Sequence, residues 1–269
     1  MHASAAACAR VYEEFIDHAF EREVLASWCA DDGGTTPRSL VRLHGRRCAA
    51  LGGAVHAKGT IAVNDVPGNI RALMARASAR AREALGDVDA RARDETRVIG
   101  DDALDASDGN DALTRTLARF EANHALINVY DDGCGILPHE DGPLYAPVVC
   151  IVSCGASRSM RFEPKRREDD DDASMRDDAE CDDADRERVN ANQDYGAFEV
   201  FLPARSLLVF YGAAYTDFLH GIADRDDEDG EGAPCQQSRG PRVSLTLRRV
   251  LNMKKGFEFL TRGNQRRPG

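Results

Sequence analysis

Short apolar runs separated by turn residues dominate the second half of the chain. In the last of them, RVSLTLRRV (242–250), apolar and polar residues alternate over 242–248, which is typical of a strand with one buried face. The apolar positions are Val243, Leu245 and Leu247, and the polar ones are Arg242, Ser244, Thr246 and Arg248. Five earlier runs predict further strands: HALINVY (124–130), APVVCIVSCG (146–155), SRSMRFEP (157–164), GAFEVFLPA (196–204) and SLLVFYG (206–212).

The first third of the chain has helical periodicity instead. Apolar residues recur at helical spacing within 8–28, which predicts a first helix packed on the core. The Gly-rich basic stretch 37–59 predicts a hairpin and loop. The Ala- and Arg-rich stretch 66–98 has high helix propensity and predicts a second helix or a helix pair.

Helices followed by many short strands predict an α+β, mainly β fold. We expect a double-stranded β-helix (jelly-roll) core over residues 121–250, with the N-terminal helices of 1–120 packed on it. At 269 residues the chain is long enough for one such domain with a full core, so a single domain over 1–269 is expected.

Two acidic segments interrupt the strand region and set the charge of the chain. Segment 168–187 carries twelve acidic and two basic residues, and 224–231 carries six and one. Without their charges of −10 and −5, the net charge of −11 becomes about +4. Because such stretches bury little apolar surface, we expect disordered inserts over 165–192 and 224–238. Binding of a basic partner, or screening of a groove, is the alternative.

The remaining composition indicates an intracellular protein. Its eight cysteines are scattered without disulfide or metal-binding spacing, and are expected to be reduced. No run is long and apolar enough for a membrane span, and the start of the chain lacks the long apolar region of a secretory signal. We expect no membrane association, and a monomer is favoured.

A candidate metal site comes from GILPHEDGPLY (135–145). His139 and Asp141 are two residues apart, so an extended strand would direct both to one face. His220, in AYTDFLHGI (214–222), could supply a third ligand. Two imidazoles and one carboxylate form the facial triad of non-haem iron(II) oxygenases. An HxD pair alone is a weak signal, and a surface turn is the other interpretation.

The polar face of 242–250 strengthens this hypothesis. Arg242 and Arg248 would point into a barrel interior, where an unpaired guanidinium is costly. No carboxylate in that strand compensates them. A dicarboxylate ligand would, since Arg binds carboxylates in a bidentate manner. Alternatively, both side chains lie outside and meet the acidic segments.

Together these motifs resemble the AlkB family of DNA and RNA dealkylating dioxygenases, and most closely its AlkB homologue 6 subgroup. The likeness covers most of residues 28–250 outside the acidic segments. It rests on GRR (45–47), GGAVHAKG (52–59), ANHALINVY (122–130), PHEDGPLY (138–145), AYTDFLHGI (214–222) and RVSLTLRRV (242–250).

The resemblance implies an Fe(II) enzyme that uses 2-oxoglutarate and O2. His139, Asp141 and His220 would bind iron. Five residues would contact 2-oxoglutarate: Asn128, Tyr130, Arg242, Ser244 and Arg248. Ser244 departs from the family, which has Asn at that position, and its shorter hydroxyl could still donate a hydrogen bond.

The resemblance also implies oxidative demethylation of alkylated bases in RNA or DNA, with the base unpaired or flipped into a pocket. A lid within 1–120 would cover the pocket, and substrate contacts would involve Tyr145, Leu144, Arg46 and Arg47. A location in nucleus and cytoplasm is likewise what the resemblance implies. Two alternatives stay open: a dioxygenase acting on a protein side chain, and a non-catalytic module that binds nucleic acid.

Overall fold

The structure is a computed structural model. It describes residues 5–29, 40–43, 45–55, 61–62, 66–96, 119–165, 196–224 and 240–251. The acidic segments lie almost entirely outside these ranges, so their predicted disorder and the single domain over 1–269 stay predictions. None of the described helices combines the length and apolar character that crossing a bilayer requires.

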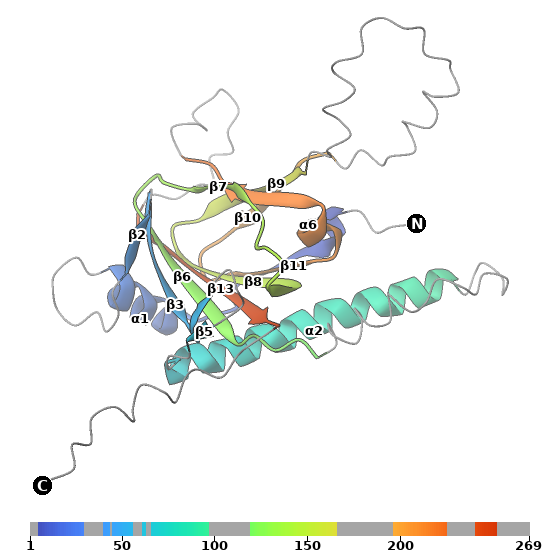
Figure 1. The fold of residues 1–269 in the computed structure, drawn as a ribbon, viewed down its shortest axis with the longest axis horizontal. Coiled ribbons are helices and arrows are strands. Elements are labelled where there is room, and N and C mark those ends of the chain that lie inside the picture. The colour runs from blue at the N-terminus through green and yellow to red at the C-terminus, as the bar shows by residue number, and fades with distance from the viewer. Residues whose placement is uncertain are drawn as a thin grey trace, which may run out of the picture.

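Two antiparallel sheets face each other and form the centre of the molecule (Figure 1). The major sheet has seven strands in the order β1 (Ala9–Tyr12), β11 (Leu207–Tyr211), β8 (Tyr145–Gly155), β13 (Arg242–Val250), β6 (His124–Tyr130), β3 (Arg46–Leu51) and β2 (Val41–Leu43). The minor sheet has four, in the order β10 (Phe198–Leu202), β9 (Arg158–Pro164), β12 (Phe218–Ile222) and β7 (Ile136–His139). The predicted mainly β, two-sheet jelly-roll class is confirmed.

Helices cover the outer face of the major sheet. They are α1 (His18–Cys29) and the long α2 (Gly68–Thr96), which runs across β8 and β11 (Figure 1). Two small elements complete the fold at the N-terminus, η1 (Ala5–Cys8) and the pair β4 (Ala54–Val55) with β5 (Ile61–Ala62). A fourth helical element, α6 (Ala213–Thr216), links β11 to β12. The predicted hairpin within 37–59 is confirmed, and 66–98 contains one helix.

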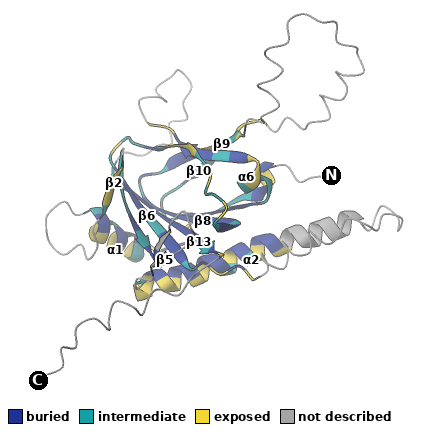
Figure 2. Ribbon diagram, in the orientation of Figure 1, coloured by how far each residue is buried: buried dark blue, intermediate teal, exposed yellow. Residues whose placement is uncertain are grey.

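The core includes buried residues of both sheets, and a large part of it lies between the major sheet and its helices (Figure 2). Val243, Leu245 and Leu247 of β13 are fully buried there, as the alternation in sequence predicts. Buried alanines such as Ala77 let α2 approach closely, and the thiol of Cys150 in β8 donates to the Ala77 carbonyl over 3.8 Å. The inner face of β13 therefore carries its polar residues towards the minor sheet.

The predicted helix over 8–28 is wrong in its first half. Residues 9–12 pair with β11 as an edge strand of the major sheet, and α1 begins only at His18. Between them Glu14 takes a left-handed conformation with a φ of 48°, which breaks any helix. Asp17 then caps α1, because its Oδ1 accepts the Phe20 N–H over 2.8 Å. Strand pairing along an open edge overrides the local helical periodicity here.

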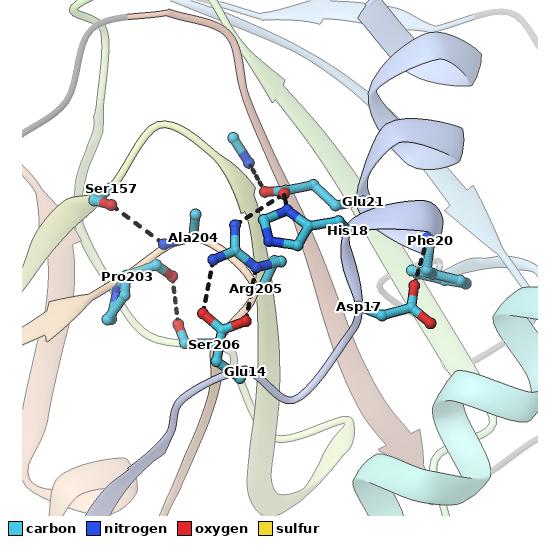
Figure 3. Close-up of polar contacts among 11 residues, drawn as sticks. Glu14, Asp17, His18, Phe20, Glu21, Ser157, Pro203, Ala204, Arg205 and Ser206 are labelled. Atoms are coloured by element: carbon cyan, nitrogen blue, oxygen red, sulfur yellow. Dashed lines mark hydrogen bonds and ion pairs between the residues drawn. The ribbon is translucent and has the colours of Figure 1, made fainter.

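A polar network joins this N-terminal segment to the turn before β11 (Figure 3). The Arg205 guanidinium donates twice to Glu14, over 2.7 and 2.9 Å, and once to Glu21, over 3.1 Å. The second oxygen of Glu21 accepts the Gly155 N–H over 2.9 Å. In addition, the Phe15 N–H donates to the Arg205 carbonyl over 2.8 Å. The network holds β8, β11 and α1 together at one end of the major sheet.

Candidate functional site

A cavity of about 940 Å³ lies between the inner faces of the two sheets. The major sheet contributes the polar face of β13 together with residues of β6 and β8. The minor sheet contributes residues of β7, β9 and β12. The polar residues predicted for the inner face of β13, Arg242, Ser244, Thr246 and Arg248, all line this cavity.

At one end of the cavity His139, Asp141 and His220 converge. One potential ligand atom of each lies within 4.8 Å of the others. The two histidines are opposite each other in the β7–β12 ladder, with ring centroids 4.4 Å apart. Backbone pairing therefore sets the distance between the imidazoles, and both project into the same space.

Asp141 lies two residues past the end of β7, where no ladder pairs it. One carboxylate oxygen, Oδ1, accepts a hydrogen bond from Arg248. The other, Oδ2, is buried without a partner and lies 4.0 Å from His220 Nε2. A buried carboxylate oxygen without a partner is costly, and a cation between it and the two imidazoles would satisfy it. The cluster thus fits a metal ion.

The protonation of the histidines suits such a role. Burial lowers the pKa of His220 to about 4, with His139 and Arg248 adding to this effect and Asp141 opposing it. The His220 ring is therefore neutral at pH 7 and keeps a lone pair for a ligand bond. The Nδ1 of His139 lies 2.8 Å from the Leu137 carbonyl, so an N–H there leaves Nε2 as the ligand atom. Two imidazoles and one carboxylate match iron(II).

Arg242 occupies the opposite part of the cavity. Its side chain is 2% exposed and stacks on the Tyr130 ring, with the guanidinium carbon 4.7 Å from the centroid. It donates one long hydrogen bond of 3.4 Å to Ser153 Oγ, while Nε and Nη1 have no partner. Among the described residues no carboxylate pairs with Arg242. Such a buried cation favours binding of an anionic ligand group.

The other residues predicted to bind the cosubstrate lie on the floor of the cavity, which is the inner face of the major sheet between Arg242 and the metal cluster. Ser244 is opposite Asn128 on one side and Ser153 on the other in the major sheet. The Oδ1 of Asn128 is buried without a partner. Arg248 lies next to the metal cluster through Asp141. A dicarboxylate such as 2-oxoglutarate, held at Arg242 by one end and reaching the cluster with the other, fits this donor arrangement.

The structure separates the four residues predicted for substrate binding. Arg46 lines the cavity, opposite Tyr130 in the β3–β6 ladder. Arg47 is the next residue in the strand and therefore points to the outer face. Tyr145 lines the cavity, but the Arg248 guanidinium covers its ring at 4.0 Å. Leu144 packs with Tyr145 and Val250 and does not line the cavity.

Three further residues contact the site, and no sequence motif marks them. Ser153 in β8 contacts Arg242, as described above. The Lys165 ammonium lies 2.5 Å from Glu140 Oε2. The Tyr215 hydroxyl donates to the Gly142 carbonyl over 3.0 Å. Burial raises the pKa of Tyr215 to about 12, so this phenol stays protonated as a donor.

Two known proteins are similar to this chain. A solved structure titled "The structure of OsALKBH1" matches 90% of this chain and 98% of its own, at 14% identity and a TM-score of 0.45. A zebrafish (Danio rerio) protein described as "Probable RNA/DNA demethylase ALKBH6" is 29% identical over 150 residues. Those residues are 52% of this chain and 58% of the relative. The zebrafish relative agrees with the resemblance to AlkB homologues that the motifs predict.

A family model described as the 2OG-Fe(II) oxygenase superfamily matches residues 55–248. This range begins just after β3 and ends within β13, so it includes the three residues of the metal cluster together with Arg242 and Arg248 of β13. Fe(II), 2-oxoglutarate and O2 are the cofactor and cosubstrates that this family implies. The chain therefore belongs to the 2OG-Fe(II) oxygenase superfamily.

Proposed function

We propose that this protein is an Fe(II)- and 2-oxoglutarate-dependent dioxygenase that removes methyl groups oxidatively from alkylated bases in RNA or DNA. One observation carries the proposal: the buried guanidinium of Arg242, which has no carboxylate partner among the described residues, shares a cavity with the His139, Asp141 and His220 cluster. The name of the zebrafish relative supports the nucleic-acid substrate.

Each polar group in the cavity has a task in this reaction. His139, Asp141 and His220 would hold iron(II), and Arg242 would bind the distal carboxylate of 2-oxoglutarate. Arg248 keeps one oxygen of Asp141 occupied, so that only the other faces the metal. With O2, the bound iron and 2-oxoglutarate supply the oxidising equivalent for a C–H bond, and 2-oxoglutarate leaves as succinate and CO2. An N-methyl group hydroxylated in this way is lost as formaldehyde.

The methylated base would enter the cavity beside Arg46. A base inside a duplex cannot reach the metal cluster between two sheets, so the substrate would be single-stranded or flipped. Arg46 is half-buried at the cavity with its Nε unpartnered, and could contact a phosphate or the base itself.

A protein side chain is the second candidate substrate. Four acidic residues line the cavity besides Asp141, against two basic residues outside the proposed cosubstrate site. The acidic ones are Glu140, Glu163, Glu199 and Asp224, and the basic ones are Arg46 and Arg161. Such a lining favours a cationic group, and a methylated lysine offers one. Retention of the complete metal cluster argues against a purely non-catalytic module.

The test is turnover on defined substrates. Methylated single-stranded DNA, methylated RNA and methylated peptides are incubated with the protein, Fe(II) and 2-oxoglutarate, and formaldehyde and succinate are both quantified. We expect formaldehyde from a nucleic acid in step with succinate. Formaldehyde from peptides alone would overturn the nucleic-acid substrate. Absence of succinate with every substrate, and of Fe(II)-dependent binding of 2-oxoglutarate, would overturn the dioxygenase itself.

A further inference from the structure

The three residues of the metal cluster are held in different ways. His139 and His220 belong to paired strands, and the backbone ladder between β7 and β12 fixes them. Asp141 belongs to a loop between β7 and β8, and nothing in the sheets fixes its main chain. Its position must therefore come from side-chain contacts to residues 140–142.

Arg248 holds the carboxylate of Asp141 itself, and two further contacts hold the loop, one on each side of Asp141. Before it, Glu140 pairs with Lys165 at the end of β9, with 2.5 Å between Oε2 and Nζ. After it, the carbonyl of Gly142 accepts a hydrogen bond from the Tyr215 hydroxyl over 3.0 Å. Gly142 has a φ of 75°, so the loop turns sharply at this residue and directs its carbonyl towards α6.

Tyr215 is itself held in place, so its hydrogen bond can fix the position of the loop. Tyr215 belongs to α6, and its backbone N–H donates to the Gly212 carbonyl over 2.9 Å. Its ring centroid lies 6.4 Å from that of Phe210 in β11. The same segment continues directly into β12 and His220. One short stretch of chain therefore carries one metal ligand and holds the loop of another.

We propose that Tyr215 and Lys165 are positioning residues for Asp141, which hold its loop against the two histidines so that all three side chains meet at one metal ion. The inference rests on the proposed function, because it assumes that the cluster binds a metal. Groups that orient a metal ligand typically change metal affinity by about 10- to 100-fold when they are removed. The Lys165 pair is partly exposed, so we expect it to contribute less.

The test is titration with Mn(II), followed by the electron paramagnetic resonance signal of the free ion, with 2-oxoglutarate present and no turnover. Tyr215→Phe removes only the hydroxyl, and we expect affinity to fall by roughly 10-fold. Lys165→Met should lower affinity by roughly threefold, and Lys165→Arg should restore it because the charge is kept.

Tyr211→Phe is the matched control. Its hydroxyl donates to the Ala84 carbonyl of α2, on the outer side of the major sheet. Mn(II) affinity should be unchanged in this variant, and the thermal unfolding midpoints of all metal-free variants show whether the fold is intact. Unchanged affinity in Tyr215→Phe, or an equal loss in Tyr211→Phe, would overturn the positioning role alone. Failure of the unaltered protein to bind Mn(II) would overturn the metal site and this inference together.

Discussion

Two arginines at the same end of the major sheet have opposite environments. Arg205 donates to two carboxylates, Glu14 and Glu21, and every contact lies within the chain (Figure 3). Arg242 is more deeply buried, yet its partners among the described residues are a hydroxyl and a tyrosine ring. Gly155 connects the two sites, because it pairs with Arg242 in the ladder and its N–H donates to Glu21, which also accepts from Arg205.

This difference separates a structural site from a ligand site. Burying a charge without a partner is costly, so a fold keeps such a group when something else compensates the charge. The charge of Arg205 is compensated by Glu14 and Glu21, and its network joins three segments of the chain. Arg242 needs an anion, and the cavity beside it is where that anion would bind. Arg248 is intermediate, because its one carboxylate partner is the proposed metal ligand Asp141.

The largest effect is expected where the ligand site meets the metal. His139→Ala removes one of three ligand side chains, and we expect Mn(II) affinity to fall by more than about 100-fold, beyond the loss of any orienting group. Turnover should fall to background. Arg205→Met, in the structural network, should leave Mn(II) affinity unchanged. Metal binding that survives in His139→Ala would contradict the assignment of the cluster.

The next prediction distinguishes the two arginines by the direction in which their replacement changes the unfolding midpoint. Arg242→Met should weaken 2-oxoglutarate binding by about 2 to 5 kcal/mol, which is roughly 30-fold or more. It should also leave the unfolding midpoint of the ligand-free protein unchanged or raised, because an uncompensated charge is gone. Arg205→Met should lower that midpoint, because Glu14 and Glu21 lose their partner. Calorimetric titration and thermal unfolding measure both; destabilisation by Arg242→Met would mean that the charge has a partner within the chain.

The network of Arg205 also predicts a pH dependence. The hydrogen bonds from Arg205 hold the pKa of Glu14 below its ordinary value of 4.5. The stabilisation is therefore fully present above pH 4.5 and is lost as the pH falls below it, because the unfolded chain takes up the proton more readily. In thermal unfolding, the difference between the unaltered protein and Glu14→Gln should shrink as the pH falls through this range. A difference that stays constant would show that the charge of Glu14 contributes no stability.

The sequence predicts contacts within one strand better than contacts between segments. Alternation in 242–250 gave both faces of β13, and the HxD spacing gave two residues of the cluster. Arg205 and its partners are separated by 184 and 191 residues, so no local pattern connects them. Tyr215 reaches Gly142 through the packing of α6, which the sequence does not encode as a motif.

Strand register explains the other differences. Arg46 and Arg47 are adjacent, and only the pairing of β3 with β6 decides which of them faces the cavity. The same uncertainty applied to Leu144 and Tyr145, of which only Tyr145 lines the cavity. At the N-terminus the open edge of the major sheet made residues 9–12 a strand despite their helical spacing.

The smallest expected effect concerns Ser244. The AlkB family, which the sequence motifs resemble, has Asn at this position. Ser244 is 2% exposed between Asn128 and Ser153, on the floor that links Arg242 to the metal cluster. An amide there reaches further into the cavity and can add one hydrogen bond to 2-oxoglutarate. One such bond has a net value of about 0.5 to 1.5 kcal/mol, so Ser244→Asn should tighten 2-oxoglutarate binding by roughly 2- to 10-fold.

The neighbouring Thr246→Val serves as the control, because Thr246 lies two residues further along the same cavity face. It removes a hydroxyl that is nearly as buried and should change 2-oxoglutarate affinity by less than about twofold. Mn(II) affinity measured without 2-oxoglutarate should be the same in both variants, since neither side chain belongs to the metal cluster. Weaker 2-oxoglutarate binding in Ser244→Asn would mean that the amide fills space which the ligand needs. The serine would then be a matched part of a tighter cavity, and the proposed orientation of the dicarboxylate along the β13 floor would have to be abandoned.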